Sequence, residues 1–311
     1  MVSNVRWICS VLLILGLYRD ITGLNDEIKY HKNWKLLPGL SSCGKVDVNE
    51  RIIGGSSAKL GQYPWIASLK EELSSRPFCG ASLINENHVL TAAHCVEKIE
   101  DDCALSPWLS VRNYHVRLGE HDWTKAIDCE GSLCAPAPTD YRILNAITHP
   151  DYTHSTHSND IALVKFEGRA TYNTFVQPIC LPQGQLLSPY RLKGHVIVAG
   201  WGRTKPNDLN SYSDVLRHVE LPVVPLKQCE KVEEMSEYPI DEHQYCVGVK
   251  NKGSCHGDSG GPMMKSLANV HSRNYFLFGI VSYGPSICAE YPAVYTNVAM
   301  YMKWILDKLS D

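Results

Sequence analysis

The chain has 311 residues, a formal net charge of −3 and 44% hydrophobic residues. So small a net charge argues against an overall electrostatic attraction to nucleic acid or to an anionic membrane. The hydrophobic content is enough for a large packed core, and the length fits one large domain.

Residues 1–23 have the pattern of a secretory signal peptide. Arg6 supplies positive charge, and residues 7–17 form an apolar run that is too short to span a bilayer. The alternative is a membrane anchor, but a Tyr-Arg-Asp sequence at 18–20 ends the apolar run early. We therefore expect a secreted, extracellular protein.

The cysteine count agrees with an oxidising compartment. The chain holds 12 cysteines, and without Cys9, which lies in the predicted signal peptide, 11 remain. None has the spacing to histidines of a zinc finger, so the pattern favours disulfides over metal binding. Because the remaining number is odd, at least one thiol is free or bridged to another chain.

Residues 24–51 are mostly polar, with a Pro-Gly pair at 38–39 and a single cysteine, Cys43. A segment of this length cannot build a core of its own, so we interpret it as a propeptide or linker. It ends at a basic residue, Arg51, which is followed by Ile-Ile-Gly-Gly at 52–55.

From residue 52 onward, short apolar runs alternate with Gly, Pro, Asn and Asp, which is typical of the strands of a β-barrel or sandwich. The C-terminus differs. Val298, Met302, Ile305 and Leu309 recur at helical spacing and predict an amphipathic helix. The apolar runs include 65–69, 81–84, 115–118, 161–164 and 195–198.

Ser259 lies in the string Gly-Asp-Ser-Gly-Gly-Pro at 257–262. Glycines let the chain turn sharply and let a substrate approach the backbone closely. Successive N–H groups in such a turn can converge on an anion. A serine hydroxyl is a weak nucleophile, so it needs a base from elsewhere in the chain. The alternative for this string alone is a glycine-rich surface turn.

His94 and Asp160 can supply that base and its orienting carboxylate. His94 stands among small residues beside Cys95, and Asp160 precedes an apolar run, where it would be largely buried. A buried carboxylate can hold the imidazole tautomer and stabilise the imidazolium. Each residue has a structural alternative, namely a packed histidine, a turn-forming aspartate and a flexible serine. Together with Ser259 they predict a Ser-His-Asp triad.

These motifs also occur together in the chymotrypsin-like secreted serine proteases, which the chain resembles from residue 52 to about residue 304. The matching strings stand in the order found in that family. They are Arg-Ile-Ile-Gly-Gly at 51–55, Thr-Ala-Ala-His-Cys at 91–95, Asp-Ile-Ala-Leu at 160–163, Gly-Trp-Gly at 200–202, the serine string at 257–262 and Gly-Ile-Val-Ser-Tyr-Gly at 279–284.

The resemblance implies an all-β fold of two six-stranded antiparallel β-barrels, with the active site between them and a C-terminal helix. The chain would comprise a signal peptide at 1–23, a propeptide at 24–51 and a protease domain at 52–311. Cys43-Gly44 and the Gln-Pro-Ile-Cys-Leu-Pro string at 177–182 resemble arthropod clip-type proteases. Residues 24–51 lack the cysteines of a clip domain, so we expect none there.

The resemblance also implies a serine endopeptidase that needs no cofactor for catalysis. Ser259 would attack the scissile carbonyl, His94 would shuttle the proton and Asp160 would orient His94. The N–H groups of Gly257 and Ser259 would form the oxyanion hole, and Ser282 would support Asp160. The rival hypothesis is a non-catalytic homologue that acts as an adaptor, but such homologues usually lose a triad residue.

Cleavage of the Arg51–Ile52 bond would activate a zymogen by freeing the Ile52 ammonium to pair with Asp258. The expected partners are a protein substrate, an activating protease and a serpin-type inhibitor, with neither nucleic acid nor a membrane. We expect a role in an extracellular cascade, such as innate immunity, or in a venom. A digestive role is a weaker alternative.

Gly253 stands six residues before Ser259, where trypsin-like members have an aspartate at the base of the specificity pocket. Binding a substrate cation there without a partner would be costly. Ser282, Gly284 and Ala293 would line the same pocket, and Ala293 should make it shallower. We therefore predict a medium-sized apolar P1 residue.

Glu290 lies near this pocket in the sequence, which keeps a basic P1 preference as the alternative.

The resemblance implies five disulfides and leaves Cys103 over, either free or bridged to another chain. The pairs are Cys43–Cys180, Cys79–Cys95, Cys129–Cys134, Cys229–Cys246 and Cys255–Cys288.

A calcium site is a further hypothesis. Glu120 and Glu130 are ten residues apart, as in the calcium loop of trypsins, with Asp122 and Asp128 between them. Oxygen ligands of this kind suit Ca²⁺. The alternative is a solvated acidic loop, because Cys129 reshapes this segment.

Overall fold

The computed structural model describes residues 26–46, 56–97, 113–187, 192–235, 238, 240–268 and 273–310. The predicted signal peptide, the Arg51–Ile52 bond and Cys103 lie outside the described residues.

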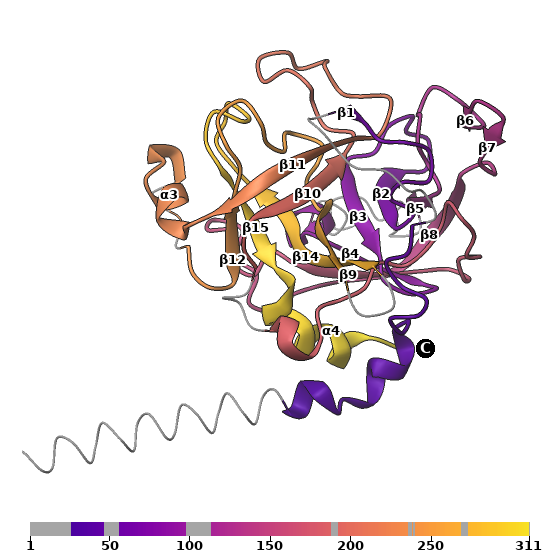
Figure 1. Ribbon diagram of the computed structural model, residues 1–311, viewed down its shortest axis with the longest axis horizontal. Helices are drawn as coiled ribbons and strands as arrows, with labels where there is room; N and C mark the ends of the chain where they lie inside the picture. The colour runs from indigo at the N-terminus through magenta and orange to yellow at the C-terminus, as the bar shows by residue number, and fades with distance from the viewer. Residues whose placement is uncertain are drawn as a thin grey trace, which may run out of the picture.

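The first half of the chain forms a closed antiparallel barrel in the order β2-β3-β4-β9-β8-β5 (Figure 1). Five of its strands are nearly continuous runs of buried residues, because one face fills the barrel and the other is largely covered by the rest of the molecule. The sixth, β8, is mostly exposed or partly buried. The strands are β2 (Ile66–Glu71), β3 (Cys79–Leu83), β4 (His88–Thr91), β5 (Tyr114–Leu118), β8 (Thr139–Thr148) and β9 (Ala162–Phe166).

The second half, together with β1 from the start of the first half, forms an antiparallel sheet in the order β1-β11-β10-β13-β14-β15-β12. An additional pairing of β11 with β12 closes six of these strands into a second barrel, which confirms the predicted fold class. The strands are β1 (Ser56–Ser57), β10 (His195–Gly200), β11 (Arg217–Val224), β12 (Gln244–Val247), β13 (Pro262–Ala268), β14 (Arg273–Tyr283) and β15 (Ala293–Asn297).

Helices are few and short in the described residues. The predicted C-terminal helix is present as η6 (Val298–Tyr301) followed by α4 (Met302–Lys308), and its apolar stripe is buried against the body of the protein. The remaining elements are η1 (Lys32–Leu36), η3 (Gly184–Leu187), α3 (Leu226–Glu230), η5 (Glu233–Met235) and a small hairpin of β6 (Cys129–Glu130) and β7 (Leu133–Cys134). No described helix has the length and apolar character needed to cross a bilayer.

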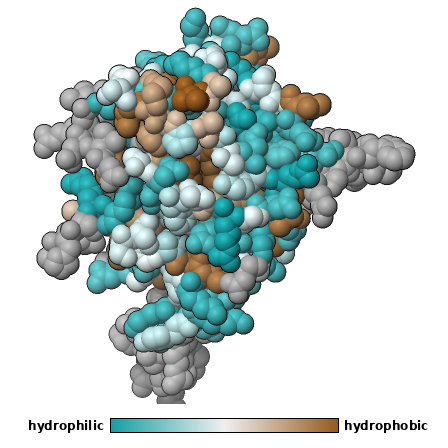
Figure 2. Space-filling model, turned by 90° about the vertical axis from the view of Figure 1, so that its right-hand side faces the viewer, coloured by the Kyte–Doolittle hydropathy of each residue, from teal (hydrophilic) through white to brown (hydrophobic). Residues whose placement is uncertain are grey.

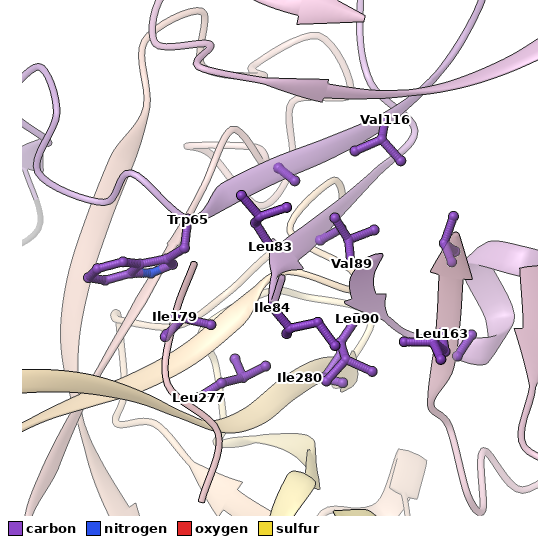
Figure 3. Close-up of a cluster of buried hydrophobic side chains, with 14 of the residues drawn as sticks. Trp65, Leu83, Ile84, Val89, Leu90, Val116, Leu163, Ile179, Leu277 and Ile280 are labelled. Atoms are coloured by element: carbon purple, nitrogen blue, oxygen red, sulfur yellow. The ribbon is translucent and has the colours of Figure 1, made fainter. Parts of the chain in front are cut away.

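A single buried cluster joins the two barrels. Leu90 of the first barrel and Ile280 of the second are both fully buried and belong to this cluster (Figure 3). The Trp65 indole also donates to the sulfur of Met264 at 3.2 Å across the same boundary. Because interiors are close-packed, this shared core holds the barrels in one fixed relation. Side chains that lie between the barrels are therefore positioned by both.

The N-terminal segment at 26–46 is docked on the body formed by the two barrels, with η1 against α4 (Figure 1). The Asn33 amide donates to the carbonyls of Leu306 and Leu309 at 2.8 and 3.1 Å. Leu306 lies in the last turn of α4 and Leu309 is its C-cap residue, where no intrahelical donor remains. Further along, Cys43 is bonded to Cys180. The segment is thus held at two separate places.

Each of the five cysteine pairs predicted from the sequence is brought together as a disulfide in the structure.

On the outer surface, hydrophilic residues cover most of the face in Figure 2, with hydrophobic residues in separate patches. This distribution is ordinary for a folded protein with an apolar interior.

Candidate active site

His94 and Asp160 meet because two paired strands of the first barrel carry them. Thr91 at the end of β4 pairs with Ala162 at the start of β9. His94 follows Thr91 and Asp160 precedes Ala162, so both side chains emerge at the same edge of the barrel. Asp160 Oδ2 lies 2.8 Å from His94 Nδ1, and the His94 N–H donates to Asp160 Oδ1 at 3.0 Å.

The second barrel supports Asp160 from the opposite side. The Ser282 hydroxyl of β14 donates to Asp160 Oδ2 at 2.5 Å. The Thr296 hydroxyl of β15 donates to the Asp160 backbone carbonyl at 2.7 Å. Asp160 is only 1% exposed, and a buried carboxylate is tolerated where donors surround it. Ser282 was predicted for this position, whereas Thr296 was missed because no local motif marks it.

The pair shifts the pKa of each partner toward its charged form. Burial by itself would lower the pKa of His94, but the adjacent Asp160 carboxylate overrides this and raises the pKa above its ordinary value. Burial would likewise raise the pKa of Asp160, yet His94 and the hydrogen bond from Ser282 keep it below its usual range. Asp160 is therefore ionised at neutral pH and stabilises a protonated His94, which is what a general base requires of its partner.

The turn that carries Ser259 packs directly beside His94. Gly80 of β3 donates to the Ser259 carbonyl at 2.7 Å. Gly260 has φ +75°, and a Cβ at that position would come within 2.2 Å of the Thr91 hydroxyl and 3.2 Å of Cys95 Sγ. Only glycine fits so close to the segment that leads into His94. Among the described residues, however, no hydrogen bond links the Ser259 hydroxyl to the His94 imidazole.

Two N–H groups of this turn have no acceptor among the described residues. Those of Asp258, Gly260 and Gly261 donate to backbone carbonyls, whereas those of Gly257 and Ser259 donate to none. Gly257 adopts φ +97°, which an L side chain rarely reaches. These are the two donors that the sequence assigned to an oxyanion hole, where N–H groups must remain free to bind developing negative charge.

Asp258 turns away from the neighbouring serine into the second barrel. Its carboxylate accepts from the N–H groups of Gly202 and Cys255 at 2.8 and 2.9 Å. A Cβ on Gly200 or Gly202 would lie 2.3 or 2.5 Å from this carboxyl group, which explains the glycines on both sides of Trp201. Burial raises the pKa of Asp258 to about 6, since two N–H donors only partly compensate for lost water.

The predicted specificity pocket lies beside the Cys255–Cys288 disulfide. Gly253 packs near Ala289, and a Cβ at Gly253 would sit 3.5 Å from the Ala289 Cα, an ordinary contact distance. A Cβ on Gly284 would come within 3.0 Å of the Ala293 Cβ, so these two walls stand close together.

Gly253 also faces a cavity of about 670 Å³ that it shares with Asp258 and with Glu290, an exposed residue.

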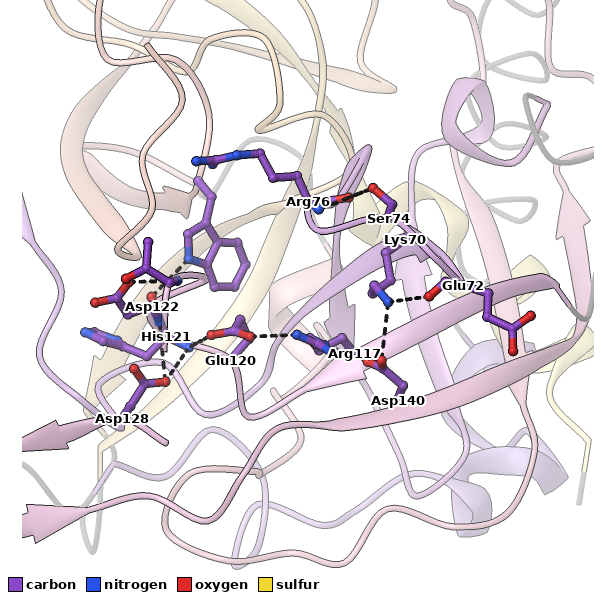
Figure 4. Close-up of polar contacts among 12 residues, drawn as sticks. Lys70, Glu72, Ser74, Arg76, Arg117, Glu120, His121, Asp122, Asp128 and Asp140 are labelled. Atoms are coloured by element: carbon purple, nitrogen blue, oxygen red, sulfur yellow. Dashed lines mark hydrogen bonds and ion pairs between the residues drawn. The ribbon is translucent and has the colours of Figure 1, made fainter. Parts of the chain in front are cut away.

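Glu120, Asp122 and Glu130 of the calcium hypothesis each have a partner within the chain. Glu120 is paired with Arg117 at 3.0 Å (Figure 4). Asp122 is paired with Lys125 at 2.7 Å. Glu130 instead accepts from the backbone N–H of Leu60 at 3.1 Å. Calcium binding stays a prediction from the sequence.

Two linked barrels with a histidine, an aspartate and a serine brought to their junction define the chymotrypsin-like class of serine proteases. The family model described as Trypsin matches residues 52–305. The chain belongs to the trypsin family.

Its relatives include arthropod CLIP-domain serine proteases. CLIP domain-containing serine protease B4 of Anopheles gambiae is 38% identical over 282 residues, which cover 88% of this chain and 74% of that protein. Phenoloxidase-activating factor 3 of Holotrichia diomphalia is 37% identical over 281 residues, covering 86% and 75%. The crystal structure of the Drosophila Grass clip serine protease of the Toll pathway matches with a TM-score of 0.71 at 30% identity, covering 90% of this chain and 76% of that one.

Replacing Asp160→Asn tests the electrostatic role of the pair. We expect kcat/KM to fall by roughly 10⁴-fold, because the imidazole loses its orienting anion. The residual activity should extend to lower pH than in the wild type, since the carboxylate no longer raises the pKa of His94 and the base stays neutral in more acidic solution. The measurement is a pH profile of kcat/KM for the cleaved enzyme.

Ser282→Ala is the matched control, because it removes one hydrogen bond to Asp160 and leaves the charge in place. Its loss of activity should be much smaller. Wild-type activity in Asp160→Asn would contradict the assignment of Asp160.

Proposed function

We propose that this serine protease is secreted as a zymogen and becomes active when the Arg51–Ile52 bond is cut. The observation that carries this proposal is the environment of Asp258. Asp258 is partly buried at the wall of the cavity, its carboxylate is held by two N–H groups, and no cationic side chain among the described residues pairs with it. A partly buried carboxylate of this kind is stabilised by any cation that can reach it.

Cleavage after Arg51 would supply such a cation, the α-ammonium of Ile52. The ammonium would keep Asp258 ionised, and the carboxylate in turn would raise the pKa of the amine above the value of about 7.7–8.0 for a free terminus. Because Asp258 directly precedes Ser259, the ion pair would fix the turn that presents the nucleophile. The catalytic mechanism would then be acyl transfer, with Ser259 as nucleophile and His94 as base.

The N-terminal segment would stay with the enzyme after cleavage. Its disulfide from Cys43 to Cys180 closes a loop that includes the cleaved bond, and the Asn33 contacts with α4 hold its other part. We therefore propose a two-chain enzyme in which the segment at 26–46 is a permanent structural part.

The substrate is proposed to be a protein with an apolar P1 residue. Gly253 offers no charge at the pocket base, and the close approach of Gly284 to Ala293 favours a side chain of medium size. Glu290, which faces the same cavity, supports the alternative of a basic P1 residue.

The printed names of the relatives, which include a phenoloxidase-activating factor and a Toll-pathway protease, support a role in an extracellular immune cascade. Regulation by a serpin-type inhibitor fits such a role.

The first test is covalent labelling with a fluorophosphonate probe. We expect protein cleaved at Arg51 to be labelled, because its activated Ser259 attacks phosphorus, and we expect Ser259→Ala to remain unlabelled under the same conditions. An Arg51→Gln protein treated with the same activating protease should resemble the uncleaved form. A cleaved, folded protein that takes up no label would instead support the adaptor hypothesis.

The pH dependence of stability tests the Asp258 ion pair. In the uncleaved chain the pKa of Asp258 is raised in the folded state, so its protonated carboxyl group stabilises the folded protein. This stabilisation is lost as pH rises through about 6. In the cleaved chain the ammonium would favour the carboxylate. We therefore expect cleavage of the Ser259→Ala protein to raise Tm more at about pH 7.5 than at about pH 4.5.

The gain in Tm on cleavage should shrink again at alkaline pH, where the Ile52 ammonium loses its proton. Asp258→Asn is the control, and it should abolish the pH dependence of the gain. An equal gain in Tm at both pH values would count against the ion pair.

Gly253→Asp tests the pocket assignment. A Cβ at Gly253 meets Ala289 at an ordinary contact distance, so the new carboxylate should offer substrate Arg or Lys a charged partner in the pocket. We expect the ratio of kcat/KM for Arg over Leu at P1 to rise by about tenfold or more. The nearly isosteric Gly253→Asn variant lacks the charge and should not show this rise.

If the wild type already prefers Arg and loses that preference in Glu290→Gln, the apolar assignment is wrong and the alternative holds.

A further inference from the structure

A second histidine lies against the catalytic imidazole. The His157 ring centroid is 6.1 Å from that of His94, and the two rings are nearly perpendicular. One ligand atom from each of His94, His157 and Asp160 lies within 4.8 Å of the other two. Acyl transfer uses His94 and Asp160 but gives His157 no task.

The position of His157 is held firmly by its surroundings. Its backbone adopts φ +51°, a left-handed conformation that is uncommon outside glycine. Its ring stacks on Tyr283 at a centroid distance of 5.1 Å and an interplanar angle of 22°, and it also contacts Tyr238 at 5.8 Å. The ring therefore lies between the His94 side of the site and two aromatic side chains.

The polar edge of His157 is not satisfied. Its Nδ1 atom is buried and has no hydrogen-bond partner among the described residues. A buried nitrogen without a partner carries a desolvation penalty, so something must normally offset it. A neutral imidazole also keeps a lone pair on one nitrogen, and that lone pair can coordinate a metal ion.

We propose that His94, His157 and Asp160 form a binding site for a divalent transition-metal ion, Zn²⁺ in particular. Two imidazole nitrogens and one carboxylate oxygen make the three-ligand set of an open zinc site, in which water takes the fourth position. Imidazole ligands favour such metals over Ca²⁺ or Mg²⁺. His94 is 20% exposed at its side chain, so the ion can enter from solvent.

The distances are close to those that such an ion needs. Ligand atoms about 2.0–2.1 Å from a tetrahedral ion stand roughly 3.3 Å apart, so the side chains must move inward from their present limit of 4.8 Å. A neighbouring group formed by Cys79, His94 and Cys95 is also compact, but its two sulfurs are joined in a disulfide and do not coordinate.

Metal binding would stop catalysis by changing the nitrogen of His94 that carries the proton. Nδ1 is the nitrogen that faces Asp160, so the ion takes the place of the Nδ1 proton that is hydrogen-bonded to that carboxylate. The neutral ring then carries its proton on Nε2, which no longer accepts the proton of the Ser259 hydroxyl, and the orienting hydrogen bond is lost. This inhibition rests on the proposed role of His94 as the base, whereas metal binding itself does not.

The experiment measures binding and inhibition separately. Calorimetric titration of cleaved Ser259→Ala protein with ZnCl₂ reports binding without self-digestion, and we expect one ion per chain. Introducing His157→Asn should weaken binding by at least about tenfold, since a ligand is lost. Asn tolerates the left-handed backbone of this position, so the variant should fold, and its Tm checks this. His195→Asn, at an exposed histidine of β10, is the matched control and should bind as before.

Cleaved wild-type enzyme should lose peptidase activity as ZnCl₂ is added and regain it with EDTA. The His157→Asn enzyme should need at least about tenfold more Zn²⁺ for the same fractional loss. Equal Zn²⁺ affinity in the His157→Asn and unsubstituted proteins overturns the site, and full activity at saturating Zn²⁺ overturns the inhibition. A protein that binds Zn²⁺ as expected but shows no peptidase activity in its absence overturns the proposed function and leaves the metal site supported.

Discussion

The buried carboxylate of Asp160 is the constraint on which the arrangement of the site depends. A charge with 1% exposure must receive hydrogen bonds from every direction it faces, or it will not stay ionised. The first barrel supplies the backbone and imidazole of His94, and the second supplies the hydroxyl of Ser282. The two barrels therefore cannot shift against each other without leaving this charge uncompensated. The shared core beneath the site keeps them in register.

Asp258 presents the opposite case within the same junction. It is partly buried and receives only two backbone N–H groups, and the pKa of its carboxyl group is raised, whereas that of Asp160 is lowered. The difference lies in the cation, since Asp160 has His94 beside it and Asp258 has none among the described residues. Under the proposed activation, one peptide-bond cleavage would make the second carboxylate resemble the first.

The features that were predicted from the sequence are those determined by residues close together in the chain. The apolar runs predicted strands, the spacing of Val298, Met302 and Ile305 predicted the C-terminal helix, and short strings around His94 and Ser259 carried the family resemblance. The two-barrel arrangement followed from the resemblance alone, because barrel closure depends on pairings between distant strands such as β11 and β12, which local patterns do not encode.

The features that were missed all involve contacts between distant residues. Thr296 is an ordinary strand residue until β15 is placed against Asp160, and Asn33 gains its meaning only where α4 ends beside it. The sequence shows that His157 stands three residues before Asp160, but a histidine at that distance from an aspartate does not by itself indicate a metal site.

What distinguishes His157 is a buried nitrogen without a partner among the described residues, next to an imidazole that must remain free to accept a proton. A catalytic base needs an exposed lone pair in a partly desolvated site, and those are also the conditions under which a metal ion binds an imidazole. Under the proposal, the second histidine beside His94 therefore lets a metal ion inhibit the enzyme at the same imidazole that catalysis requires.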